Sequence, residues 1–165
     1  MSSALVAGIA LAGLALCLGC GGCSKPEPGP THGSEGKSSP PSGPVSLALS
    51  LDKGGYAVGE RVRMRLVATN TTGREVTLDF PTAQRFDFVV RLAGRVVWQW
   101  SADMMFAQIL GSETLAAGDS LVFEAEWDQG LGGGTNPALG AYTVQGVVKA
   151  RPELATQERK FGIVD

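Results

Sequence analysis

The sequence lacks the side chains on which most catalytic and metal sites depend. Its 165 residues include one histidine, His32, and three cysteines, Cys17, Cys20 and Cys23, all near the N-terminus. The rest of the chain therefore has no imidazole or thiol for Ser/His/Asp or Cys/His catalysis, and no thiolate ligand for zinc. It also has no cysteine for an internal disulfide. We expect a domain that is not an enzyme and that holds no cofactor and no metal.

An excess of charge of one sign is missing as well. The chain has 14 Lys and Arg against 16 Asp and Glu, and the two signs are mixed along it. Nucleic-acid-binding domains carry a basic patch or stripe, which this pattern does not supply. The glycine-rich segment 130–134 has neither the spacing of a dinucleotide fingerprint nor a following Gly-Lys-Ser/Thr. We interpret it as a connector and expect no nucleic-acid partner.

The one long apolar run lies at residues 4–19 (ALVAGIALAGLALCLG). It is shorter than the roughly 20 residues of a membrane span and ends in small residues, which is typical of a signal peptide. The Leu-Gly before Cys20 resembles the bacterial lipobox, with Cys17 where leucine is usual. We therefore predict lipidation at Cys20, with Cys23 as the alternative. An uncleaved anchor or plain secretion remains open, and each of these exports the domain.

Residues 24–44 (SKPEPGPTHGSEGKSSPPSGP) have almost no aliphatic or aromatic side chains. Such a segment cannot bury enough apolar surface to fold, so we expect a disordered linker. As a flexible chain it would span roughly 25 Å. The predicted organisation is a signal peptide over 1–23, this linker, and one folded domain over 45–165. The predicted location is the bacterial cell envelope, with the domain lipid-anchored to a membrane.

Apolar residues in the folded part recur with a period of two, which is typical of strands with one buried and one wet face. The eight candidate strands are 45–51, 61–68, 76–80, 86–92, 96–100, 121–127, 142–148 and 161–163. Turn residues separate them, and the Ala93-Gly94 link predicts a hairpin. The pattern favours an all-β sandwich over alternating strands and helices. Segment 103–110 is compatible with one short helix.

A group of carboxylates and a group of aromatic rings could each form a functional site. For both groups, a purely structural role is favoured. Glu124, Glu126 and Asp128 share one strand face opposite apolar residues, so we expect them to face solvent. A glycosidase pair would need a cleft that raises one pKa, and weak calcium binding lacks a supporting loop. The large rings of 86, 88, 98, 100, 123 and 127 are expected to form the core between two sheets, with a ligand-stacking platform as the alternative.

Three blocks of the domain form a pattern: Gln84, Phe86 and Asp87, then Trp98, Trp100 and Ser101, and later Trp127. Together they resemble the bacterial intracellular proteinase inhibitor family, often called BsuPI. The match covers about 47 to 148. It implies an immunoglobulin-like antiparallel β-sandwich of about seven to eight strands and inhibition of serine proteinases. The matching residues look like core and hairpin residues, so they identify a fold more than a site.

An inhibitor needs a protruding, preorganised loop that fills an enzyme cleft. Residues 101–111 are the best candidate, because Met104, Met105 and Phe106 would fill an apolar specificity pocket. The alternative is that Met104 and Phe106 cap one end of the sandwich. The leading hypothesis is thus a membrane-tethered, exported module that binds a protein, most concretely a serine proteinase. The other is a non-inhibitory accessory domain of the envelope that binds protein or glycan partners.

Overall fold

The computed structural model describes residues 43–130 and 137–165, and every regular element in them is a strand. The predicted signal peptide, its lipidation site and nearly all of the linker lie outside these residues. The strands are β1 (Val45–Leu51), β2 (Gly55–Ala57), β3 (Val62–Asn70), β4 (Val76–Phe80), β5 (Phe86–Leu92), β6 (Arg95–Gln99), β7 (Gly111–Leu115), β8 (Ser120–Trp127), β9 (Gly140–Val148), β10 (Leu154–Ala155) and β11 (Arg159–Val164). In this part of the chain no helix long and apolar enough to cross a membrane is found.

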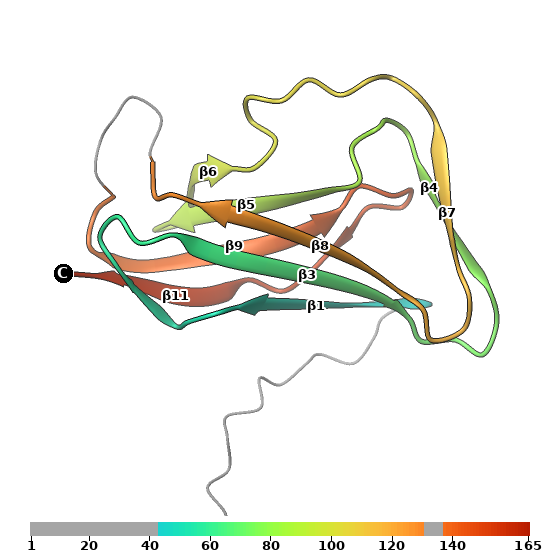
Figure 1. The fold of residues 1–165 in the computed structure, drawn as a ribbon, viewed down its shortest axis with the longest axis horizontal. Coiled ribbons are helices and arrows are strands. Elements are labelled where there is room, and N and C mark those ends of the chain that lie inside the picture. The colour runs from blue at the N-terminus through green and yellow to red at the C-terminus, as the bar shows by residue number, and fades with distance from the viewer. Residues whose placement is uncertain (1–42, 131–136) are drawn as a thin grey trace, which may run out of the picture. The chain divides into compact units, whose positions relative to one another are not determined.

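Two facing sheets make up the body of the domain (Figure 1). One has the strand order β1-β3-β8, and the other has the order β2-β11-β9-β5-β6 with β10 beside β9. All neighbours are antiparallel except β2 and β11. Immunoglobulin domains place strands A, B and E in one sheet and C, F and G in the other. Here β1, β3 and β8 take the first set of places, and β5, β9 and β11 take the second.

A second mark of the immunoglobulin fold is a tyrosine corner, in which a tyrosine near the start of strand F bonds to the backbone a few residues upstream. Tyr142 lies near the start of β9, is fully buried, and donates its hydroxyl hydrogen to the carbonyl of Ala138 at 2.7 Å. Sheet order and tyrosine corner together confirm the predicted immunoglobulin-like antiparallel β-sandwich.

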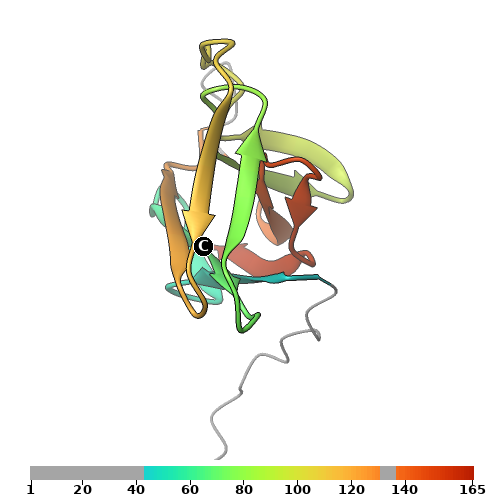
Figure 2. The ribbon, with the colours of Figure 1, turned by 90° about the vertical axis from the view of Figure 1, so that its right-hand side faces the viewer.

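A two-stranded ribbon of β4 and β7 crosses one end of the two sheets (Figure 2). All eight predicted strands are present, and β2, β7 and β10 bring the number in the described residues to 11. The estimate of seven to eight strands was too low because these three give little signal. β2 is three residues long and β10 is two residues long. β7 (GSETL) has only one buried apolar residue, Leu115.

The expectation of a short helix at 103–110 is wrong, since residues 104–110 have no regular structure. The carbonyl of Ala107 accepts a hydrogen bond from the backbone amide of Ala83 at 2.9 Å, and the ring of Phe106 lies 6.0 Å from that of Trp100. Contacts with residues outside the segment therefore hold it in an irregular conformation.

The core between the sheets is rich in aromatic rings, as predicted. Trp127 on β8 is fully buried, and its ring lies 6.1 Å from that of Trp98, 5.8 Å from Tyr142 and 6.4 Å from Phe161. Phe88 is also fully buried, whereas the rings of 86, 98, 100 and 123 are partly buried and pack against the core. Burying one such side chain stabilises the fold by about 1.5–3 kcal/mol.

The outer face of the β1-β3-β8 sheet is charged, as the alternation predicted. Arg61 and Arg63 both donate to the carboxylate of Glu126, at 2.9 and 3.0 Å, and Arg65 pairs with Glu124 at 3.1 Å. The two arginines lower the pKa of Glu126. A general acid would need the opposite shift, so Glu126 has the character of a surface ion-pair partner.

Candidate functional site

The segment between β6 and β7 carries a concentration of exposed apolar side chains. The exposed fraction is 99% for Met105, 79% for Leu110, 66% for Ile109 and 45% for Met104. Figure 1 shows residues 100–110, named the β6–β7 loop here, as an arch outside the two large sheets. Contiguous apolar groups left in water on a folded domain mark a binding surface. The β6–β7 loop is therefore the candidate site.

Phe106, one of the three predicted loop residues, is turned toward the domain. Its ring lies 6.0 Å from that of Trp100, which stacks on Phe86 at 4.2 Å. Phe86 in turn stacks on Phe123 at 4.8 Å. This row of rings runs from β8 to the middle of the loop. The alternative interpretation, in which Met104 and Phe106 cap one end of the sandwich, describes the position of Phe106 but not that of Met104, which is exposed, as is Met105.

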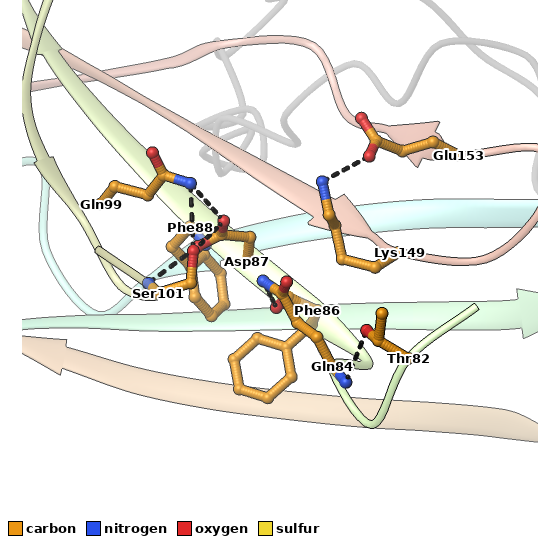
Figure 3. Close-up of polar contacts among 9 residues, drawn as sticks. All are labelled: Thr82, Gln84, Phe86, Asp87, Phe88, Gln99, Ser101, Lys149 and Glu153. Carbon is orange, nitrogen blue, oxygen red and sulfur yellow. Dashed lines mark hydrogen bonds and ion pairs between the residues drawn. The ribbon is translucent and has the colours of Figure 1, made fainter. Parts of the chain in front are cut away.

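A buried carboxylate holds the start of the loop. Asp87 on β5 is 2% exposed. Its oxygens accept hydrogen bonds from Gln99 Nε2 at 2.6 Å, from Ser101 Oγ at 2.6 Å and from the Ser101 amide at 3.2 Å (Figure 3). The amide of Phe88 donates a fourth bond at 3.0 Å. A buried charge is costly unless it is hydrogen-bonded, and these donors satisfy it while fixing the backbone at Ser101.

The residues that carry the family resemblance fall into two groups. Phe86, Asp87, Trp100 and Ser101 contact one another at the base of the β6–β7 loop, and Gln84 Nε2 donates to the carbonyl of Phe86 at 3.1 Å. In the second group, the rings of Trp98 and Trp127 face each other between the sheets. The first group thus links the family-motif residues to the exposed segment.

Sequence reasoning missed two of the exposed residues, Ile109 and Leu110. Apolar residues are buried by default, and an Ile-Leu pair before a glycine gives no signal to the contrary. It also missed Gln99, whose amide reaches Asp87 from the neighbouring strand. Only the β5–β6 pairing brings these two side chains together.

The described residues offer no other chemical centre near the loop. Within 43–130 and 137–165, no group of three or more His, Cys, Asp or Glu side chains is placed to hold a metal ion. The buried hydroxyl of Tyr56 donates to Asp52 at 2.5 Å, which lowers the pKa of Asp52, while burial raises the pKa of Tyr56. This pair belongs to the turn between β1 and β2, so its role is to hold that turn.

Comparison with known proteins gives one family and several structures of low identity. The family described as intracellular proteinase inhibitor, BsuPI, matches residues 49–153. None of the curated proteins matches the chain. A β-glucosidase from Erythrobacter marinus is 15% identical over 73% of this chain and 15% of its own, with a TM-score of 0.45. The alkylpurine DNA glycosylase AlkC of Pseudomonas fluorescens is 13% identical over 74% and 31%, with a TM-score of 0.47.

The CARDB domain of the PF1109 protein from Pyrococcus furiosus is 12% identical over 73% of this chain and 87% of its own, with a TM-score of 0.42. This chain spans 15% and 31% of the first two proteins. The family match, in contrast, takes in more than half of the chain, from β2 to β9, including the β6–β7 loop and the residues at its base. The family's description is that of an inhibitor and not of an enzyme. The chain belongs to the intracellular proteinase inhibitor family, BsuPI.

Proposed function

We propose that the domain inhibits a serine proteinase by placing the β6–β7 loop in the enzyme's active-site cleft. The observation that carries the proposal is the exposed apolar surface of Met104, Met105, Ile109 and Leu110 on a loop whose start and middle are held by Asp87 and Ala83. Holding the loop before binding reduces the entropy that binding must overcome. The family's description supports a proteinase as the partner.

The backbone of the loop favours the same mode of binding. Within the described residues, none of the amides of 105–110 donates a hydrogen bond. A segment without regular structure whose amides donate no hydrogen bond can pair with an exposed strand of a partner, which gives affinity while side chains supply specificity. The loop can therefore offer both main-chain hydrogen bonds and apolar side chains to a cleft.

The side chains point to an enzyme with an apolar primary pocket. Residues 104–110 (MMFAQIL) include no charged side chain, and the one charged residue of the loop, Asp103, precedes them. The exposed apolar part of the loop therefore has nothing to pair with a charged pocket. Met105 is the most exposed of them and its unbranched thioether side chain adapts to irregular apolar surfaces. We assign Met105 to the primary pocket, and Met104, Ile109 and Leu110 to contacts beside it.

We further propose that the domain acts at the cell envelope on a lipid anchor. The lipobox-like Leu-Gly-Cys20, with Cys23 as the alternative, and the linker 24–44 support this part of the proposal. The partner would then be a proteinase of the envelope.

The test is titration of a panel of serine proteinases of differing pocket preference with the purified full-length protein. We expect stoichiometric inhibition of an enzyme with an apolar pocket. Met105→Asp should weaken inhibition roughly 100-fold, since it places a charge at a hot spot worth about 3 kcal/mol.

Val164→Asp is the control, because Val164 is an exposed apolar residue on β11, outside the loop, and it should inhibit like wild type. Absence of inhibition at micromolar concentration across the panel would overturn the inhibitor proposal. Capture of envelope proteins without any effect on the panel would favour the accessory domain that binds protein or glycan partners.

A further inference from the structure

Four residues at the start of β5 and just before it contact the β6–β7 loop at its start, its middle and its end. This segment, 83–87, includes the Gln84-x-Phe86-Asp87 block of the family resemblance. At the start of the loop, Asp87 accepts bonds from the amide and the hydroxyl of Ser101. In the middle, the amide of Ala83 donates to the carbonyl of Ala107 at 2.9 Å. No other part of the described chain makes a comparable set of contacts with the loop.

The end of the loop is met by Arg85. Its guanidinium lies so close to Gly111 that a Cβ built there would be 2.5 Å from Nη2. The same side chain donates from Nη1 to the carbonyl of Thr82 at 2.8 Å and from Nε to Glu113 at 3.4 Å. It also lies over the ring of Phe80 with its Cζ 4.5 Å from the centroid. Arg85 is thus held from three sides against the point where the loop becomes β7.

Segment 83–87 also connects the loop to the core. Phe86 stacks on Trp100 and on Phe123, so the row of rings that supports Phe106 passes through this segment at Phe86. The contacts involve a carboxylate, a backbone amide, a guanidinium and a ring, and all act on residues 100–111. The exposed side chains Met104, Met105, Ile109 and Leu110 take no part in them.

We propose that segment 83–87 is a clamp that holds the β6–β7 loop in its binding conformation, with Arg85 and Asp87 as positioning residues. The effect of the clamp on inhibition rests on the proposed function. A loop lying in a proteinase cleft resists cutting only while it stays rigid. Loss of the clamp leaves the apolar side chains in place but makes the loop costly to order. The domain then changes from an inhibitor into a substrate that is cut within the loop.

The test compares Asp87→Ala, Arg85→Ala and Gly111→Ala with wild type, using the full-length protein. Gly111→Ala displaces the guanidinium of Arg85 without removing it. This variant can therefore test the clamp if Asp87→Ala does not fold. Asn70→Ala is the matched control. Asn70 is as buried as Asp87, but its amide and carbonyl groups bond to residues 72, 74, 115 and 116, outside the loop. All measurements are made where unfolding curves show each variant to be folded.

The first readout needs no proteinase. Backbone order parameters of residues 102–110 should be near the rigid value of about 0.85 in wild type and in Asn70→Ala, and below about 0.6 in the clamp variants. Unchanged order parameters in Arg85→Ala and Gly111→Ala would overturn the clamp, whether or not any proteinase is inhibited.

The second readout uses the proteinase found by the titration. The inhibition constant of the clamp variants should rise roughly 10- to 100-fold, the effect of ordering one or two additional residues on binding. Cleavage between 102 and 110, followed by mass spectrometry, should accelerate by a similar factor, while Asn70→Ala shows neither change. A mobile loop with undiminished inhibition and no faster cleavage would overturn the positioning role. A wild-type protein that inhibits no proteinase would instead refute the proposed function, and the order parameters would still decide the clamp.

Discussion

At the scale of single residues, the domain is specified by a few buried polar side chains that bond to other strands and turns. Gln129, 1% exposed, donates from Nε2 to the carbonyls of Ala57 and Glu60, at 2.8 and 2.7 Å, and accepts from the amide of Gly59 at 2.8 Å. The buried polar atoms of Asn70 and Asp87 also have hydrogen-bond partners, like those of Gln129. In the described part of the chain no buried side-chain nitrogen or oxygen lacks a partner, so each of these residues fixes one connection between strands.

These residues could not be predicted from the sequence, whereas the strand faces could. Alternation in 61–68 and 121–127 correctly assigned arginines and glutamates to solvent, because the two-residue period of a strand is a local property. The burial of Gln129 depends on residues about 70 positions earlier, which no local pattern contains. The base of the loop depends in the same way on the pairing of β5 with β6, so Asp87 was identified as a motif residue but its partners were not.

Ion pairs on the charged sheet face predict a pH dependence of stability. The hydrogen bonds from Arg61 and Arg63 lower the pKa of Glu126 below its ordinary value of 4.5. A carboxylate with a lowered pKa in the folded state contributes stability above its ordinary pKa, and this contribution is lost as pH falls through the folded-state value. The free energy of unfolding should therefore fall as the solution is acidified below about 4.5.

Urea unfolding at a series of pH values checks this prediction, with Glu126→Gln as the comparison. The variant should lose less stability on acidification than wild type, and high salt should reduce the difference because the pairs are exposed. Identical pH profiles for the two proteins would show that Glu126 contributes nothing.

At the scale of elements, the β5–β6 hairpin was predicted from two residues and is confirmed. Ala93 and Gly94 form its turn with φ angles of 49° and 77°, and Leu92 pairs with Arg95. Both central residues of such a turn need positive φ, which favours Asn-Gly. Alanine in the left-handed region costs roughly 1–2 kcal/mol, so the first position of this turn is strained.

Ala93→Asn should therefore stabilise the domain by about 0.5–1 kcal/mol, because asparagine tolerates the left-handed conformation better. The midpoint of denaturant unfolding measures the gain, and Ala102→Asn, another exposed position outside the hairpin turn, provides the control. A loss of stability in Ala93→Asn would mean that residue 93 does not have a positive φ in this turn.

The β6–β7 loop is the element for which sequence reasoning failed most. A short helix was expected at 103–110, and its apolar residues allowed two interpretations: an exposed loop presenting Met104, Met105 and Phe106, or a cap made by Met104 and Phe106. The structure has no helix here, turns Phe106 toward Trp100, and leaves Met105, Ile109 and Leu110 in water. The Ala83–Ala107 hydrogen bond fixes this arrangement. Only the three-dimensional pairing brings those two residues together.

At the scale of the whole molecule, the proposed lipid anchor and linker would confine the inhibitor to the envelope. The family description names an intracellular inhibitor, whereas the N-terminal pattern predicts export, so the proposed partner differs in location from the one that the description implies. The family membership and the fold hold for the domain in either location.

Cell fractionation of cysteine variants tests the anchor. Cys20→Ala should move the protein from the membrane fraction to the soluble fraction, because the thiol that would be acylated is gone, while Cys23→Ala should stay with the membrane. Release by Cys23→Ala alone would transfer the lipidation site to Cys23. Retention of both variants would favour an uncleaved apolar anchor.

The most direct test of the central claim is hydrogen exchange of the full-length protein, free and bound to a serine proteinase. The amides of 105–110 donate no hydrogen bond within the described residues, so they should exchange rapidly in the free protein. The account predicts that these amides become protected in the complex, and that the charged face carrying Arg63 and Glu126 does not change. Protection of that face, with the loop still exchanging rapidly, would contradict it.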